Sequence, residues 1–148
     1  MSIYSKLFEI QQNLKAPKGQ YNKFGNFHYR SCEDILEAVK PILAQQRAVV
    51  TLYDELVYNG QRYYIKATAC LLDIETGEQI KSEAYAREEE GKKGMDSSQV
   101  TGASSSYARK YALNGLFCID DNKDSDTTNT YRKENPQAQN QQQNKYCC

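Results

Sequence analysis

The chain has 148 residues with 19 Lys or Arg, 19 Asp or Glu and no net formal charge. This balance excludes a generally basic nucleic-acid-binding protein, so any DNA site must be a local patch. There is no run of 18 apolar residues and no signal-peptide layout at the N-terminus, so neither a membrane span nor secretion is expected. Five cysteines without a framework spacing indicate a reducing cytosol and no structural disulfides.

Two amphipathic helices are predicted in the first part of the chain. Apolar residues recur at helical spacing over residues 3–14, and this helix should end before the breaker cluster at 16–19. Ser31, followed three residues later by Asp34, predicts the N-terminal cap of a second helix. Pro41 lies inside the apolar pattern of this second helix and should kink or split it.

Between these helices lies an aromatic and polar segment, residues 21–29, which is expected to be a loop or an irregular strand. Two interpretations stay open. In the first, the rings close the edge of the core. In the second, they stack on bases while the cations contact phosphates, because rings interleaved with cations suit single-stranded nucleic acid. The residues concerned are the rings Tyr21, Phe24, Phe27 and Tyr29 and the basic side chains Lys23, His28 and Arg30.

From Ala48 the hydrophobic period changes to two, which predicts a three-stranded antiparallel meander. Asn59-Gly60 is a strong hairpin signal because both residue types tolerate positive φ. One face of the meander is mostly apolar and requires a helix to cover it. The predicted strands are residues 48–58, 62–74 and 79–87, and the second turn is 75–78.

A third helix should supply this cover. Asp96 predicts its N-terminal cap, and the pattern continues to about Leu113. A stripe that contains Tyr107 and Tyr111 is predicted to lie in the core. A neighbouring stripe of small residues, Thr101, Ser105, Ala108 and Ala112, would let the helix lie close on the sheet.

The expected fold class is therefore α+β, with a β-β-β-α core of a three-stranded antiparallel meander packed by helices. Beyond Asp126 the composition turns to Asn, Gln, Thr and Lys with almost nothing apolar, which predicts disorder. The expected organisation is a single domain over residues 1–127 and a flexible polar tail over residues 128–148.

Two segments of the chain, QVTGASSSYARKYALNGLFCIDD and YNKFGNFHYRSCEDILEAVKPIL, match a known pattern. They resemble the two markers of the ERF family of phage single-strand annealing proteins, a family placed in the Rad52-like superfamily. With the stretch between them they cover about residues 21–126. The resemblance implies single-stranded DNA binding and ATP-independent annealing in phage-type homologous recombination. It also implies a homo-oligomeric ring or filament, a bacterial host cytoplasm, and a tail that recruits a host or phage single-strand-binding protein.

Enzyme chemistry finds little support in the residues. The acidic run at 120–126 lacks the glycine and the bidentate glutamate of a calcium loop. His28 is the only histidine, so no Ser-His-Asp or Cys-His arrangement can be built without it. No catalytic residue, metal ligand or cofactor is predicted. Three alternatives stay open: a plain single-stranded-DNA-binding protein without annealing, a metal-dependent nuclease that uses the acidic run, and an assembly protein that does not bind DNA.

The predicted DNA contacts are cations, because phosphates require Lys or Arg for neutralisation. Arg109 and Lys110 come first, since they fall on the basic pair of the family's Tyr-Ala-Arg-Arg/Lys-Tyr motif. Lys at the second position keeps the charge but loses the bidentate phosphate geometry of Arg. The full predicted set is Arg109, Lys110, Lys66, Lys81, Arg87, Lys92, Lys93 and Arg30.

Overall fold

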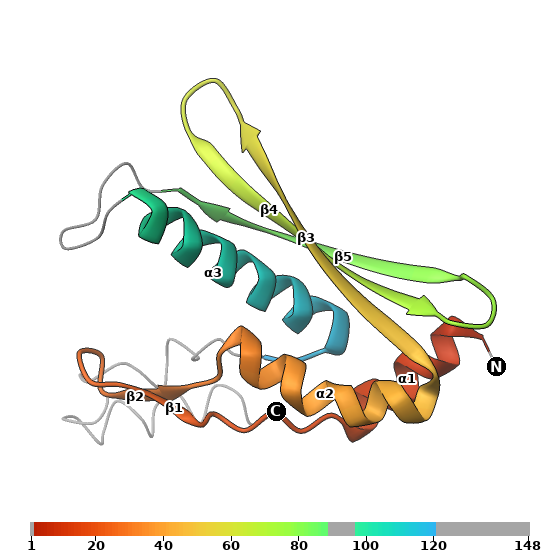
Figure 1. The fold of residues 1–148 in the computed structure, drawn as a ribbon. Helices are drawn as coiled ribbons and strands as arrows, with labels where there is room; N and C mark the ends of the chain where they lie inside the picture. Colours follow the sequence, from red (N-terminus) through yellow and green to blue (C-terminus); the bar gives the residue numbers. More distant parts are fainter. Residues whose placement is uncertain (1, 89–96, 121–148) are drawn as a thin grey trace, which may run out of the picture.

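The structure is a computed structural model that describes residues 2–88 and 97–120, except for the side chains of 97–100. The cap predicted at Asp96 and the predicted tail lie outside these residues. The structure contains three helices and five strands in the described residues (Figure 1), and the expected α+β class is confirmed. The elements are α1 (Ile3–Asn13), β1 (Gln20–Asn22), β2 (Phe27–Tyr29), α2 (Cys32–Gln46), β3 (Ala48–Tyr58), β4 (Tyr63–Asp73), β5 (Gln79–Arg87) and α3 (Ser97–Phe117).

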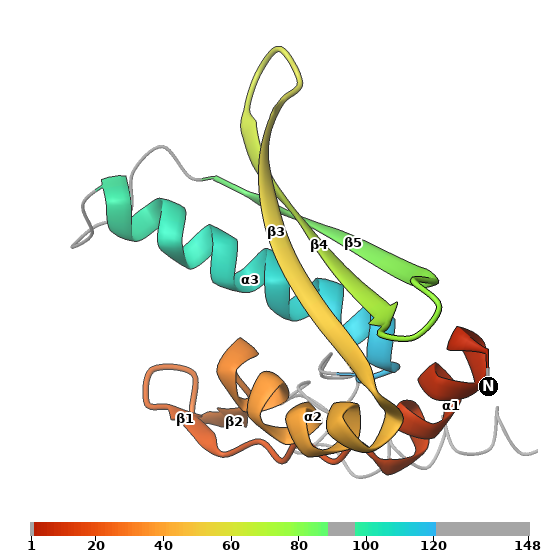
Figure 2. The same cartoon turned by 45° about the vertical axis from the view of Figure 1, so that its right-hand side comes forward.

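The last three strands form the predicted antiparallel sheet, in the order β3-β4-β5. Alternate residues of β4 point to opposite faces, and Ile65, Ala67, Ala69 and Leu71 are buried on one of them. All three helices lie on this side of the sheet (Figures 1 and 2). The core is therefore a single layer between the sheet and the helices. In the described part of the chain, no helix covers the other face.

The turn between β3 and β4 is longer than its Asn-Gly signal predicts. Oδ1 of Asn59 accepts hydrogen bonds from the backbone N–H groups of Gln61 (3.0 Å) and Arg62 (2.9 Å). Gly60 has a φ of +94°, in the left-handed region that glycine favours. Because the asparagine side chain takes the place of a backbone acceptor, β4 begins at Tyr63 instead of the predicted Arg62.

Helix α2 begins at the predicted cap. Oγ of Ser31 accepts from the N–H of Asp34 (3.2 Å), and Oδ2 of Asp34 accepts from the N–H of Ser31 (2.9 Å), which completes a capping box. The backbone hydrogen bond from Ser31 lowers the pKa of Asp34. The helix is not split at Pro41. This proline is exposed and removes one internal hydrogen bond, while Ile35 and Val39 hold the helix in the core.

Helix α3 ends at Phe117, four residues beyond the predicted end. The additional turn buries the Phe117 ring in the core. The small-residue stripe behaves as predicted at Ala108 and Ala112, which are fully buried against the sheet. Gly115 allows the same close approach, because a Cβ at this position would lie 2.8 Å from Oγ of Ser82 in β5.

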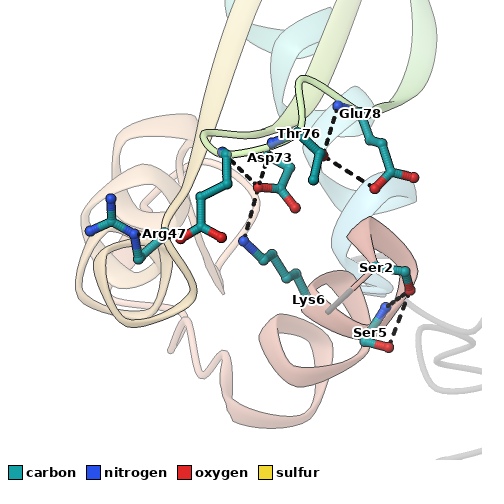
Figure 3. A network of polar contacts seen from close by, with 8 residues as sticks. Ser2, Ser5, Lys6, Arg47, Asp73, Thr76 and Glu78 are labelled. Carbon is teal, nitrogen blue, oxygen red and sulfur yellow. Dashed lines mark hydrogen bonds and ion pairs between the residues drawn. The ribbon is translucent and has the colours of Figure 1, made fainter.

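A buried ion pair, which the sequence did not predict, joins α1 to the sheet (Figure 3). Nζ of Lys6 lies 3.0 Å from Oδ1 of Asp73, and the two residues are only 5% and 2% exposed. The same oxygen accepts from the backbone N–H groups of Glu75 (2.9 Å) and Thr76 (3.4 Å). The hydrogen bond from Glu75 and the one from Lys6 lower the pKa of Asp73. The carboxylate therefore stays charged at neutral pH and links α1 to the β4–β5 turn.

Candidate nucleic-acid interface

Strands β1 and β2 form a hairpin beside the N-terminal end of α2 (Figure 1). Its tip is held together by its own side chains. Oδ1 of Asn22 accepts from the backbone N–H groups of Phe24 (2.9 Å) and Gly25 (3.1 Å). The hydroxyl of Tyr21 donates to Oδ1 of Asn26. The segment predicted as a loop or an irregular strand is thus an ordered hairpin.

The chain around this hairpin is strongly basic. Residues 15–30, here called the basic hairpin segment, contain four Lys or Arg and no Asp or Glu, whereas the whole chain is balanced. The nearest acids in the sequence are Glu9 and Glu33. The zero net charge of the whole chain therefore does not show this local cationic segment. Counting charged residues in successive short stretches of the sequence would have identified it. The cations are Lys15, Lys18, Lys23 and Arg30.

The rings of the basic hairpin segment do not all belong to the core. Phe24, at the tip, is fully exposed at 103%, and Tyr21 is also exposed. The interpretation that the rings close the edge of the core is therefore wrong for these two. Phe27 and Tyr29 are half-buried, with ring centres 6.1 Å apart in an edge-to-face arrangement. The hairpin thus buries one pair of rings and presents the other pair to solvent.

Helix α3 brings Lys110 next to this hairpin. Its Nζ lies 5.7 Å from the ring centre of Tyr29 and 6.0 Å from that of Tyr111, within the range of cation–π attraction. Tyr107 and Tyr111 are 60% and 40% exposed, so the prediction that they lie in the core is wrong. The helix packs through the neighbouring stripe of small residues, which leaves both tyrosines outside the contact with the sheet, with ring centres 5.7 Å apart.

The guanidinium of Arg109 forms an ion pair with a carboxylate of the same chain. Its Nε lies 3.0 and 3.2 Å from the two carboxylate oxygens of Asp54 in β3, and the hydroxyl of Ser105 donates to the same carboxylate. Burial by itself would raise the pKa of Asp54, but the hydrogen bonds from Arg109 and Ser105 outweigh burial and lower it. The hydrogen bond to Asp54 in turn raises the pKa of Arg109. Arg109 therefore ties α3 to β3, and its role as a DNA contact stays a prediction.

This ion pair predicts a pH-dependent loss of stability. A carboxyl group with a lowered pKa in the folded protein stabilises the fold above its unfolded value of about 3.9, and this contribution is lost as pH falls through the folded pKa. Asp54→Asn should therefore have a lower melting temperature than wild type at pH 7. This difference in melting temperature should become smaller below about pH 4. Thermal melts of both proteins from pH 7 to pH 3 measure this difference.

The matched control for this experiment is Glu55→Gln, which removes the neighbouring carboxylate on the opposite face of the same strand. It should leave the melting temperature nearly unchanged across the range. If the difference in melting temperature between Asp54→Asn and wild type does not depend on pH, the charge of Asp54 does not stabilise the fold.

Three of the predicted DNA contacts lie on the uncovered face of the sheet. Nζ of Lys66 is 3.4 Å from Oε1 of Glu83, and the hydrogen bond to this carboxylate raises the pKa of Lys66. Lys81 and Arg87 occupy positions of β5 that share this face, because they pair with Cys70 and Tyr64 of β4. The structure therefore divides the predicted cations between two surfaces, since Lys110 lies on the helix side of the sheet.

The remaining predicted cations are Arg30, Lys92 and Lys93. Nε of Arg30 donates to the carbonyl oxygen of Ala16 (2.7 Å), which closes the basic hairpin segment at its base. Lys92 and Lys93 lie outside the described residues. Arg30 thus belongs to the basic hairpin segment, and it holds the shape of the segment through its hydrogen bond.

Residues 2–88 and 97–120 contain neither a cluster of metal-binding side chains nor a helix able to span a membrane. In these ranges no group of three His, Cys, Asp or Glu side chains is placed to hold a metal ion. The acidic run after Asp120, which the nuclease alternative requires, falls outside them. None of the helices described combines the length and the apolar character that a bilayer span needs.

Comparison with known proteins yields two matches. The ERF superfamily matches residues 3–147 of the chain. The essential recombination function protein of Salmonella phage P22 is 57% identical over 133 residues, which are 90% of this chain and 63% of that protein. The chain thus spans less than two thirds of the length of this relative. No solved structure matches the chain.

Proposed function

The chain belongs to the ERF superfamily, and from this premise we propose that it binds single-stranded DNA and anneals complementary strands in phage recombination, without nucleotide hydrolysis. One observation carries the proposal. The basic hairpin segment combines four cations with exposed rings and no acid, and Lys110 of α3 lies beside it. Cations neutralise phosphates and rings stack on unpaired bases, so this surface has the chemistry that a single strand requires.

Within this proposal the cations divide into two roles. Lys23 and Lys110 contact phosphates, because Lys23 adjoins the exposed ring of Phe24 in the sequence and Nζ of Lys110 lies 6.0 Å from the ring centre of Tyr111, which is also exposed. Arg109 is a positioning residue, since its bond to Asp54 holds the helix that carries Lys110 against the sheet. The P22 relative is named for a recombination function, which is the biological setting that we infer for this chain.

Annealing requires a strand that is held extended by its backbone while its bases stay accessible to a second strand. A single subunit with balanced charge offers few phosphate contacts. Several copies side by side would join their basic hairpin segments into a continuous binding surface and multiply these contacts. The proposal therefore includes a homo-oligomeric ring or filament. The outer strands β3 and β5 are candidates for the subunit contacts, because each has one edge without a strand partner among the described residues.

Fluorescence annealing of two complementary oligonucleotides, without ATP or divalent metal, tests this function. We expect the protein to accelerate annealing above the spontaneous rate and to bind single strands with an affinity that falls as salt rises. Tight binding without acceleration would favour the plain single-stranded-DNA-binding alternative. Strand cleavage on addition of Mg²⁺ would favour the nuclease alternative. Neither binding nor annealing would overturn the proposal.

A further inference from the structure

We propose that Phe24 inserts between neighbouring bases of the bound strand, as a stacking wedge at the tip of the basic hairpin segment. The inference rests on the proposed function and adds to it a specific contact with bases. The Phe24 side chain is 103% exposed, and no other large apolar side chain among the described residues is as exposed. The ring therefore makes no contribution to the core, although it is fully apolar.

The backbone that carries this ring is ordered before any ligand binds. The side chain of Asn22 accepts from the N–H groups of Phe24 and Gly25, which fixes the backbone on both sides of the ring. Asn26 has a φ of +53° and receives the hydroxyl of Tyr21. A Cβ at Gly25 would overlap the ring of Phe27, so only glycine fits this tip without a shift. Because the backbone is already ordered, binding through Phe24 carries little further loss of conformational entropy.

The surroundings of Phe24 favour a nucleobase over a protein surface. The ring stands alone at its tip, between Asn22 and Lys23 on one side and Gly25 and Asn26 on the other. A stable protein interface buries about 800 Å² on each partner, far more than one ring supplies. A single apolar side chain is, in contrast, the size that separates two stacked bases, and Lys23 beside it can contact the phosphate between them.

The chain contains no tryptophan, which allows a direct test of stacking. Phe24→Trp would place the only indole at the tip, where it can still stack on bases. We expect its fluorescence to be quenched when oligo(dT) is added to the full chain. The matched control is Tyr4→Trp, at an exposed position on α1. The N-terminus of the chain, where α1 begins, lies on the other side of the molecule from the hairpin of β1 and β2 (Figure 1). Its fluorescence should not change at DNA concentrations that saturate binding.

A second variant measures the contribution of the ring to affinity. Phe24→Ala should bind oligo(dT) about tenfold more weakly than wild type, with the same salt dependence, because a stacking contact is lost and no phosphate contact is. Its melting temperature should match that of wild type, since the ring is exposed.

The outcomes that overturn the wedge differ from those that overturn the function. Wild-type affinity in Phe24→Ala, or an unquenched Phe24→Trp protein that still binds DNA, would overturn the wedge and leave the proposed function standing. If Phe24→Ala changes the mass of the oligomer in light scattering but not the DNA affinity, the ring contacts another copy and the wedge is again overturned. If wild type does not bind oligo(dT), both proposals fail.

Discussion

Replacing Lys6 by methionine is expected to lower the melting temperature of the protein by about 10 °C. Methionine keeps the apolar stem in place but removes the ammonium that lies 3.0 Å from the buried carboxylate of Asp73. Oδ2 of Asp73 has no hydrogen-bond partner among the described residues, so no other cation takes over. The variant leaves a buried, uncompensated charge, which is among the most destabilising changes that a single substitution makes.

Two further variants show whether charge is the cause. Lys40→Met makes the same change at an exposed ion pair on α2, where Nζ of Lys40 lies 2.8 Å from Oε1 of Glu37. It should change the melting temperature by no more than about 2 °C. The double variant Lys6→Met with Asp73→Asn should recover part of the loss, because the amide oxygen can still accept from the β4–β5 turn without carrying a charge. Equal melting temperatures for Lys6→Met and Lys40→Met would contradict the proposed importance of the buried pair.

The double variant Lys23→Ala with Lys110→Ala is expected to lower the affinity for single-stranded DNA by about tenfold at physiological salt. Each lysine that neutralises one phosphate releases bound counterions. Loss of two contacts should also reduce the slope of log affinity against log salt by about 1.4. Fluorescence anisotropy of a labelled oligo(dT) at several salt concentrations measures both quantities.

The matched control for the DNA experiment removes two lysines from the uncovered sheet face, Lys66→Ala with Lys81→Ala. This variant loses the same formal charge, but Lys66 is already bound to Glu83, so its contribution to phosphate binding should be small. We expect its affinity and its salt slope to stay close to those of wild type. If the sheet-face variant loses more affinity than the hairpin variant, the DNA runs over the sheet and the choice of interface is wrong.

The sequence by itself determined the helices and the strands of the three-stranded sheet, because their signals are local, whereas the hairpin of β1 and β2 was expected only as a loop or an irregular strand. The two-residue alternation predicted β3 and β5 with the bounds that the structure has, and the cap at Ser31 depends on a side chain three residues away. The order of the sheet followed from its short connections. The aromatic and cationic character of residues 21–29 was also visible in the sequence, although the choice between core and surface was not.

Only the tertiary structure decided which side chains are paired, buried or presented to solvent. Lys6 and Asp73 are 67 residues apart, and Arg109 and Asp54 are 55 apart, so no periodicity within one element could indicate either pair. Tyr107 is exposed because the face that a helix buries depends on the rotation that its partner sheet imposes, and small residues packed closest to that sheet. Local patterns act within a few residues and specify elements. Burial and ion pairing result from contacts between elements distant in the sequence, and these form only in the folded chain.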